Sequence, residues 1–227
     1  MPPADRLAFL AERRAASTHR FDHLHSPRYD ENWGAISPSH AAFVARLAGQ
    51  VRQGGTVLDA ACGTGKYWPA LLAAGLQVTG VDQSAGMLAQ ARRKHPQVES
   101  RVLALQDLAA LPDRFDGLLC VDALEYVGPE DWPGVAAGLA AVLADRAPAY
   151  VTVEQLPDGP LLPPADPRQV PGEVTDGGGY HYYPPRDQVL RWLAGAGFAV
   201  TDQADADYYW HLFLIRTDRG LSPPDPP

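Results

Sequence analysis

Residues 56–67 read TVLDAACGTGKY, and this stretch decides the fold. A short apolar run ends in Asp59, two glycines follow at Gly63 and Gly65, and helical periodicity resumes after them. The pattern predicts a strand, a tight loop and a helix. Because Gly63 and Gly65 lack a Cβ, their backbone can adopt unusual dihedral angles and let a ligand approach closely.

Three kinds of ligand-binding loop share such a glycine pair. A nucleotide P-loop requires G-x-x-x-x-G-K-[ST], but Ala60 stands at the first glycine position and Tyr67 follows Lys66. A dinucleotide-binding loop requires a third glycine three residues after Gly65, where the chain has Trp68. The remaining interpretation is a loop in which an acid closes the strand ahead of G-x-G.

Composition and charge predict one domain. The chain has 227 residues, of which 46% are hydrophobic and 20% charged, and this is enough to bury a core. A formal net charge of −8 without a Lys/Arg run makes nucleic acid an unexpected partner. The charged N-terminus and the lack of a long apolar window predict neither a leader nor a membrane span. The chain has only two cysteines, Cys62 and Cys120, which predicts a reduced, cytoplasmic protein without a metal site. Abundant Ala, Arg and Pro are typical of a GC-rich bacterial genome.

Strands and helices are expected to alternate along most of the chain. The predicted strands are 56–60, 77–81, 101–105, 115–121 and 149–154, and the last two, 198–201 and 208–217, are close enough to pair as a hairpin. Helices are expected at 4–19, 68–74, 132–143 and 186–194, and after Ser37 and Ser84. This alternation predicts a mostly parallel, doubly wound α/β sheet with helices on both faces. Ligands of such sheets bind beyond the carboxyl ends of the strands.

Two segments lack a clear period. Residues 21–33 are rich in aromatic residues and histidines, and residues 155–185 form an irregular insert of Pro, Gly and Asp. A structureless insert of that length inside a compact domain is usually functional or disordered. The proline-rich tail, 218–227, is expected to be disordered.

An acid, Asp82, ends the second predicted strand. A carboxylate there accepts hydrogen bonds from both hydroxyls of a ribose, which an apolar side chain cannot do. A solvated loop acid is the alternative. The glycine loop at the neighbouring strand end favours the ribose interpretation.

Four segments in this order resemble the motifs of class I S-adenosylmethionine (SAM) dependent methyltransferases: 57–65, 80–88, 106–108 and 115–127. The resemblance implies a Rossmann-like sheet of seven strands in the order 3-2-1-4-5-7-6, with the last strand antiparallel. It implies one domain over residues 1–227, with an N-terminal helical lid at 1–50 and a SAM-binding core at 51–217. It also implies SAM as the cofactor and S-adenosyl-L-homocysteine (SAH) as its product.

The resemblance assigns a role to each strand end. It places the glycine loop against the methionine and ribose, Asp82 on the ribose, Asp107 on the adenine amino group and the end of the fourth strand at the methionine. The implied cofactor-binding residues are Asp59, Ala61, Gly63, Gly65, Asp82, Gln83, Met87, Gln106, Asp107, Leu108, Val121 and Asp122.

The chain departs from the family after the fourth strand, where a histidine is frequent and this sequence has Glu125 and Tyr126. No base is assigned there, and Glu125 is expected to be a surface acid. The candidate catalytic base is His181, which lies in an aromatic cluster ahead of a helix and has a side-chain pKa suited to the task. Simple packing of the ring is the alternative.

The acceptor is expected to contact the two segments of least regular pattern and the end of the fifth strand. Aromatic side chains there suit a flat or apolar small molecule, and an acid at the end of the fifth strand attracts an amine. Ordinary packing or solvation remains the alternative for each of them. The candidate substrate-binding residues are Tyr29, Trp33, His40, Glu154, Tyr180, Tyr182 and Tyr183.

These patterns predict an enzyme that moves a methyl group from SAM to O, N or C of a small molecule by in-line displacement. The protein is expected to be a monomer or homodimer. One alternative is a protein of the same fold that binds SAM without transferring the methyl group, as a cyclase or a regulatory module. Another, a nicotinamide-dependent oxidoreductase, is disfavoured by Trp68.

Overall fold

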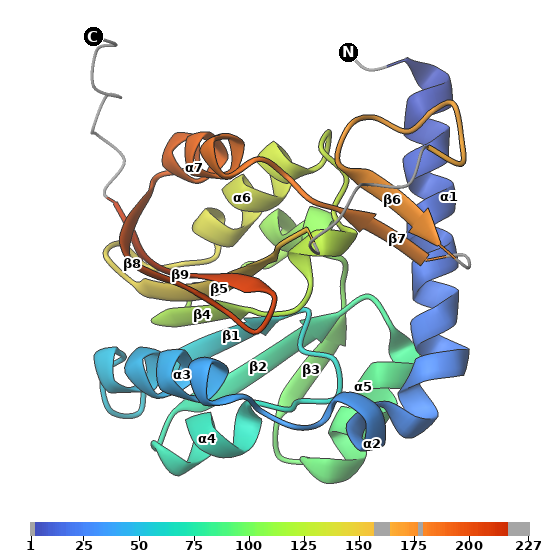
Figure 1. Ribbon diagram of the computed structural model, residues 1–227. Coiled ribbons are helices and arrows are strands. Elements are labelled where there is room, and N and C mark those ends of the chain that lie inside the picture. Colours follow the sequence, from blue (N-terminus) through green and yellow to red (C-terminus); the bar gives the residue numbers. More distant parts are fainter. Residues whose placement is uncertain (1–2, 157–163, 177–178, 218–227) are drawn as a thin grey trace, which may run out of the picture.

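Seven strands form one sheet in the order β3-β2-β1-β4-β5-β9-β8 (Figure 1). The structure, a computed structural model, describes residues 3–156, 164–176 and 179–217. Strands β1 to β5 are parallel, while β9 runs antiparallel to both β5 and β8, which confirms the predicted order and its antiparallel last strand. The strands are β1 Thr56–Ala60, β2 Gln77–Asp82, β3 Glu99–Val102, β4 Gly117–Cys120, β5 Pro148–Glu154, β8 Phe198–Ala206 and β9 Tyr209–Arg216.

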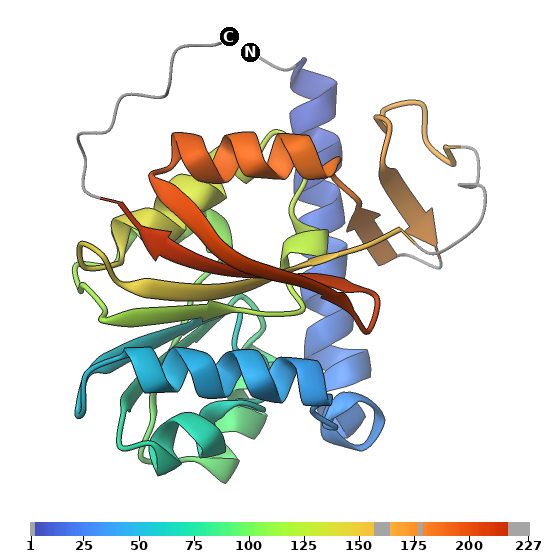
Figure 2. The same ribbon diagram turned by 60° about the vertical axis from the view of Figure 1, so that its left-hand side comes forward.

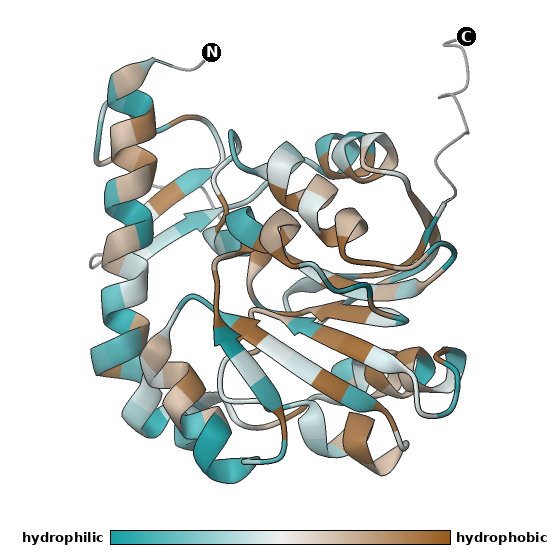
Figure 3. Ribbon diagram, turned by 180° about the vertical axis from the view of Figure 1, so that it is seen from behind, coloured by the Kyte–Doolittle hydropathy of each residue, from teal (hydrophilic) through white to brown (hydrophobic). Residues whose placement is uncertain are grey.

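Helices cover both faces of this sheet (Figure 2). One face carries α3 Pro38–Gln50, α4 Trp68–Ala73 and α5 Ala85–Lys94, and the other carries α6 Trp132–Ala141 and α7 Arg186–Gly195. Successive side chains of β4 pack on opposite faces of the sheet. Leu118 and Cys120 belong to the core beneath α6 and α7, and Leu119 belongs to the core on the other face. Apolar residues run along the central strands in Figure 3, as expected of a sheet buried on both sides.

Two strands differ from their predicted bounds by three residues or more at one end. β3 ends at Val102 rather than Leu105, because its partner β2 ends at Asp82, opposite Val102, and the 3-10 turn Leu105–Ala110 follows. β8 continues to Ala206, beyond the predicted 198–201, through a bulge between Val200 and Asp202. Alternating polar residues on this edge strand hide its length from a reading of hydrophobic pattern.

The N-terminal segment is helical throughout, including the aperiodic 21–33. Helix α1 Ala4–Arg20 continues into a π-helical turn, Phe21–His25, a 3-10 turn, Ser26–Arg28, and α2 Tyr29–Trp33. Each change of helix type shifts the residue period away from 3.6, so no single amphipathic pattern survives in the sequence. The next helix, α3, packs on the sheet, where Val44 and Leu47 are buried.

The insert at 155–185 is not structureless, and the prediction was wrong for its second half. β6 Glu173–Asp176 and β7 Gly179–Tyr182 form a separate antiparallel pair. Residues 157–163, 177–178 and the predicted tail 218–227 lie outside the described residues. The pair depends on contacts with the distant helix α1, which a local pattern does not contain.

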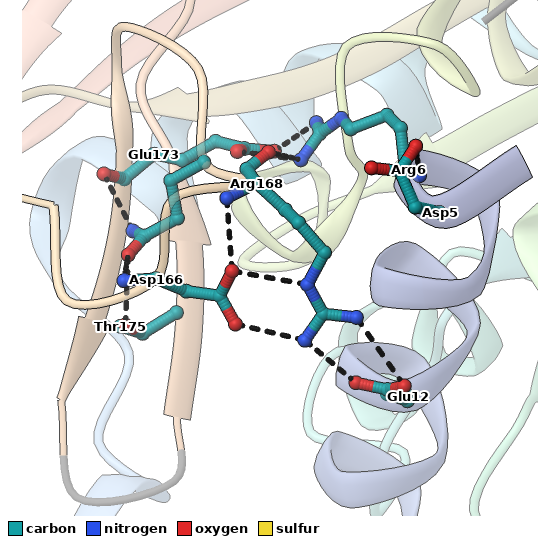
Figure 4. A network of polar contacts seen from close by, with 8 residues as sticks. Asp5, Arg6, Glu12, Asp166, Arg168, Glu173 and Thr175 are labelled. Carbon is teal, nitrogen blue, oxygen red and sulfur yellow. Dashed lines mark hydrogen bonds and ion pairs between the residues drawn. The ribbon is translucent and has the colours of Figure 1, made fainter. Parts of the chain in front are cut away.

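Ion pairs hold this insert against α1 (Figure 4). The guanidinium of Arg6 bonds the buried carboxylate of Glu173 and also Glu130, with 2.8 Å between Nε and Oε1 of Glu130. Arg168 bridges Asp166 at 2.8 Å and Glu12 of α1 at 3.1 Å. The strand pair is therefore fixed to the N-terminal helix by charge as well as by packing.

Candidate functional site

A cavity opens where the carboxyl ends of β1, β2 and β4 meet the N-terminal segment. It encloses about 910 Å³, including its open mouth. Arg14, Ser17, Phe21 and Tyr29 of the N-terminal segment form part of its wall. Of the predicted cofactor-binding residues, the cavity is lined by Asp59, Ala61, Gly63, Asp82, Gln83, Met87, Gln106, Val121 and Asp122.

Three predicted cofactor residues are not in this lining. Gly65 faces Trp68 of its own loop, with φ +75°, and a Cβ there would lie 2.7 Å from the indole ring. Asp107 is exposed, and Leu108 is fully buried against α6. Contact of Asp107 with adenine therefore stays a prediction, while the neighbouring Gln106 does reach the cavity.

The carboxylate of Asp82 is anchored by the main chain on both oxygens. Gly63 N donates to Oδ2 and Ser84 N donates to Oδ1, each at 2.8 Å. Burial raises the pKa of Asp82 to about 6, although these two hydrogen bonds act in the opposite direction. Each carboxylate oxygen keeps a lone pair for a further donor, such as a hydroxyl of a ligand.

Asp59 supports the loop from behind. It is 2% exposed, and Trp68 Nε1 donates to its Oδ2 at 2.9 Å. Burial raises the pKa of Asp59 to about 7. Trp68 stands where a dinucleotide-binding loop requires its third glycine. Its indole has a role of its own here, because it orients Asp59 at the end of the strand.

The backbone is left-handed just after two of the strands that meet at the cavity. Ala61 has φ +62° and Asp122 has φ +54°, in a region where residues other than glycine are uncommon. Thr152, fully buried on β5, accepts the N–H of Asp122 at 2.9 Å and so helps to hold that conformation. Strained backbone of this kind gathers at functional sites.

The side chain of Asp122 meets one cation and one histidine. Lys66 Nζ lies 3.2 Å from Oδ2, and His40 Nε2 lies 3.6 Å from Oδ1, which has no hydrogen-bond partner among the described residues. The hydroxyl of Tyr67, which lines the cavity beside them, is also buried without a partner there. This corner of the cavity therefore holds a carboxylate oxygen and a phenol hydroxyl that have no hydrogen-bond partner in the described part of the chain.

A hydrogen-bond chain fixes the proton on His40. His211 Nε2 lies 3.1 Å from the carbonyl of Ala206, so this nitrogen carries a proton and Nδ1 accepts. The Tyr150 hydroxyl therefore donates to His211 Nδ1 at 2.7 Å and accepts from His40 Nδ1 at 2.9 Å. Burial lowers the pKa of His40, so its Nε2 presents a lone pair to Asp122.

The N-terminal segment is fastened over the cavity by two acids. Asp22 accepts from Ser84 Oγ at 2.6 Å and from Gly86 N at 2.8 Å, at the first turn of α5. Asp30 accepts from Thr64 in the glycine loop at 2.5 Å and from Lys94 at 2.6 Å. Neither acid was singled out in the sequence, since nothing there links residues 21–33 to the strand ends.

A second group of predicted residues lies behind the cavity wall. His181 Nδ1 is 2.8 Å from Glu154 Oε2 at the end of β5 and 3.3 Å from the hydroxyl of Tyr183. The ring of Tyr126, which lines the cavity, stands at 5.0 Å from the His181 ring and 5.4 Å from that of Phe21. Tyr126 therefore links the cavity wall to a cluster of Glu154, His181 and Tyr183, and the sequence had assigned Tyr126 no role.

The alternation of β7 divides the predicted aromatic cluster. Tyr180 and Tyr182 are buried toward the core, and the Tyr180 hydroxyl donates to Glu173 at 2.6 Å. Two further residues were predicted to contact the methyl acceptor. Tyr29 lines the cavity, whereas Trp33 is 46% exposed and packs on the Tyr29 ring. His40 lies beside Asp122, as described above.

Glu125 is not a surface acid, contrary to the expectation from the sequence. It is 3% exposed, and its Oε2 has no partner in the described part of the chain. Burial first, and then the charges of Glu154 and Asp122, raise its pKa well above the usual value. The short turn Leu124–Tyr126 turns this side chain inward, and no local pattern signals that direction.

Searches of the described residues for metal and membrane features gave two negative findings. No group of three or more His, Cys, Asp or Glu side chains there is arranged to hold a metal ion. No described helix combines the length and apolar character that a membrane span requires.

Comparison with known proteins finds a methyltransferase domain in part of the chain. Residues 57–146 match a methyltransferase domain family. Ubiquinone biosynthesis O-methyltransferase of Xanthomonas campestris is 36% identical over 103 residues, which are 41% of this chain and 43% of that protein, so the match spans less than half of the relative's length. Magnesium protoporphyrin IX methyltransferase of Synechocystis, solved with SAM, aligns with a TM-score of 0.68 at 19% identity over 91% of this chain and 97% of the other.

A second solved structure shares the fold over almost the whole chain. The 1,6-didemethyltoxoflavin-N1-methyltransferase of Burkholderia thailandensis aligns with a TM-score of 0.70 at 20% identity, covering 96% of this chain and 93% of the other. The glycine loop between β1 and α4 and the acid at the end of β2 lie within the matched residues. Residues 57–146 thus match a methyltransferase domain, and almost the whole chain shares its fold with methyltransferases solved with SAM or SAH.

Proposed function

We propose that this protein transfers a methyl group from SAM to a small-molecule acceptor and that the cofactor occupies the cavity at the ends of β1, β2 and β4. When bound, the cofactor supplies a methyl carbon on a cationic sulfur, which a positioned nucleophile attacks in line. The protein's part is to bind, to align and to receive a proton. The chemistry of the cavity supports this assignment at both of its ends.

At one end, Asp82 is prepared for a ribose. Its two oxygens are held by Gly63 and Ser84 and retain lone pairs toward the cavity. Two adjacent hydroxyls of a sugar match two carboxylate oxygens in a bidentate arrangement. This anchored carboxylate is the observation that carries the proposal.

At the other end, unmet groups fit an amino acid. Asp122 Oδ1 and His40 Nε2 are both acceptors, 3.6 Å apart, and an ammonium group between them donates to both. The Lys66 ammonium and the Tyr67 hydroxyl beside them suit a carboxylate. The methionine part of SAM carries both groups, so this corner matches it in charge and in hydrogen bonding.

His181 serves as the catalytic base in this proposal. Its Nδ1 donates to the Glu154 carboxylate, which fixes the tautomer and leaves Nε2 as an acceptor. In the described part of the chain, no hydrogen bond involves Nε2. A histidine oriented by a carboxylate is an effective general base near neutral pH.

A small-molecule acceptor, a cytoplasmic location and a monomer or homodimer complete the proposal. The named relatives act, by their names, on ubiquinone precursors, a porphyrin and a toxoflavin precursor, which are all small molecules. The net charge of −8 argues against a nucleic acid acceptor.

Calorimetric titration with SAH tests the cofactor assignment. We expect micromolar binding, and a rise in Kd of about a hundredfold or more for Asp82→Ala, because the ribose loses both acceptors. Asp187→Ala, at an exposed acid of α7 paired with Arg191, is the control and leaves the affinity unchanged. Absence of SAH binding by the wild-type protein contradicts the proposal.

A further inference from the structure

One oxygen of the buried Glu125 carboxylate has no hydrogen-bond partner in the described part of the chain. Only 3% of the residue is exposed, and Oε2 accepts no hydrogen bond from any described residue. No described Lys, Arg or His pairs with it, since Lys66 is engaged by Asp122 and His181 by Glu154. Burial raises the pKa of Glu125, so the free protein holds it as a neutral acid, and a cation brought by a ligand would favour its ionised form.

Glu125 lies beside the site rather than in the remote core. It belongs to the turn Leu124–Tyr126, and Ala123, Tyr126 and Val127 around it line the cavity. Its charged neighbours are Glu154, at the end of the adjacent strand β5, and Asp122. Two strand ends thus bring like charges together at the boundary between the cavity and the His181 cluster.

Aromatic rings surround this pair of acids. After burial, the charge of Glu125 is the largest cause that raises the pKa of Tyr126 and of Tyr209, and Glu154 acts on both in the same direction. Glu125 and Asp122 both act on Tyr29, which lines the cavity. Tyr126 directly follows Glu125, and Tyr209 of β9 is the ladder partner of Glu154, so two phenol rings adjoin the two carboxylates, and ring faces carry partial negative charge.

We propose that Glu125 and Glu154 bind the ammonium form of the methyl acceptor, so that the substrate is an amine with an aromatic or apolar body and the product is its N-methylated form. This inference rests on the proposed function and specifies its acceptor. Carboxylates and ring faces are the groups that recognise an ammonium ion. They repel an acidic acceptor, so carboxylic acids and phosphates are excluded as substrates.

The same groups account for the proton. The bound ammonium loses one proton to Nε2 of His181, whose positive charge the Glu154 carboxylate stabilises through Nδ1–H. The free amine lone pair then forms the nitrogen–carbon bond as the carbon–sulfur bond breaks, and the bonding electrons remain on sulfur. The products are a methylated ammonium ion and a neutral thioether. The ammonium product keeps its carboxylate partner until release.

Matched acceptors separate the amine from its competitors. We would incubate the protein with isotope-labelled SAM and three sets of identical carbon skeletons: benzylamine, benzyl alcohol and benzoate; phenethylamine, phenethyl alcohol and phenylacetate; tryptamine, tryptophol and indoleacetate. Methylated amines detected by mass spectrometry support the proposal. Products from alcohols or acids alone, or from no member of the panel, overturn it.

Binding without turnover gives a second readout. In calorimetry with SAH present, the best amine of the panel binds Glu125→Gln about tenfold or more weakly than the wild type, since the substitution removes a buried charge that pairs with the ammonium. Glu154→Gln weakens binding in the same way and also changes the pH profile of turnover, because it releases His181. Glu99→Gln, an exposed acid on β3, is the control and leaves amine binding unchanged. Equal amine affinity in wild type and Glu125→Gln overturns the proposal.

The SAH titration distinguishes the two levels of inference. If the wild type and Glu125→Gln bind SAH equally while no amine is bound or methylated, the amine proposal is wrong and the cofactor assignment stands. If SAH itself does not bind, the proposed function has failed.

Discussion

The cavity and the cluster behind Tyr126 are built in different ways. Nearly half of the residues that line the cavity lie within 59–87, where the main-chain N–H groups of Gly63 and Ser84 anchor Asp82. Glu154 and His181 of the cluster and the nearby Glu125 come from three separate elements. His181 lies on a strand pair that ion pairs hold to α1. The first site is encoded locally, and the second depends on long-range contacts. The two should therefore fail separately.

Arg6→Met removes an ion pair that holds the β6–β7 strand pair to α1, and it has the largest expected effect on stability. The Glu173 carboxylate, with a side-chain exposure of 0%, loses its cation, and the free energy of unfolding falls by about 3–5 kcal/mol. Methyl transfer falls with it, while the Kd for SAH stays within about threefold because Asp82 is untouched. Urea denaturation and calorimetry measure both quantities.

Arg28→Met is the matched control for Arg6. Arg28 pairs with Glu31 on the surface, both side chains being more than half exposed, so the change leaves the free energy of unfolding nearly unchanged. A parallel loss of SAH affinity and turnover in Arg6→Met would show that the two regions are not separable.

Gly65→Ala attacks the cavity side. At φ +75° an alanine is strained, and its Cβ falls 2.7 Å from the Trp68 ring that holds Asp59, so we expect a loss of about 2–4 kcal/mol in stability. SAH binding weakens while the Glu154–His181 contact is unaffected. Gly49→Ala, in α3 with open space around it, is the control and is neutral or stabilising. A Gly65→Ala protein of wild-type stability would contradict this account.

The pH dependence of the free energy of unfolding, compared between the wild type and Glu125→Gln, tests the burial of Glu125. The ordinary pKa of a glutamate is near 4.5, and burial raises that of Glu125 in the folded state, so above this pH the folded protein binds more protons than the unfolded chain. Wild-type stability therefore falls as pH rises, and Glu125→Gln removes that loss. We expect the variant to gain on the wild type from pH 5 to 8, by at most about 1.4 kcal/mol per pH unit. A constant difference across that range would refute the burial argument.

Asp22→Ala tests how the N-terminal segment covers the cavity, and its expected effect is the smallest. Ser84 Oγ and Gly86 N lose their acceptor at the start of α5, for about 1 kcal/mol of stability. The exchange rates of the amides of residues 21–33 should rise in the variant. Glu31→Ala, at an exposed acid of the same segment, leaves those rates unchanged if the Asp22 contacts are responsible.

Local encoding explains which features were predictable from the sequence. The glycine loop and Asp82 follow from spacing along one segment, whereas the strand order was implied by the family resemblance, and all three were confirmed as fold features. The inward turn of Glu125, the strand pair β6–β7 and the Asp22 contacts depend on residues far apart in the chain, such as Arg6 and Glu173. A hydrophobic pattern records which face of an element is buried, but it does not record which distant charge neutralises a buried one.

The hydrogen-bond chain from Ala206 to His40 has a direction. The carbonyl of Ala206 at the end of β8 only accepts, so each proton along His211, Tyr150 and His40 points toward the sheet edge. The lone pair that His40 offers to Asp122 is thus selected by the pairing of β8 with β9. Fraying of that outer hairpin would free the imidazole to exchange tautomers, and the nitrogen chemical shifts of His40 would report it before any strand dissociated.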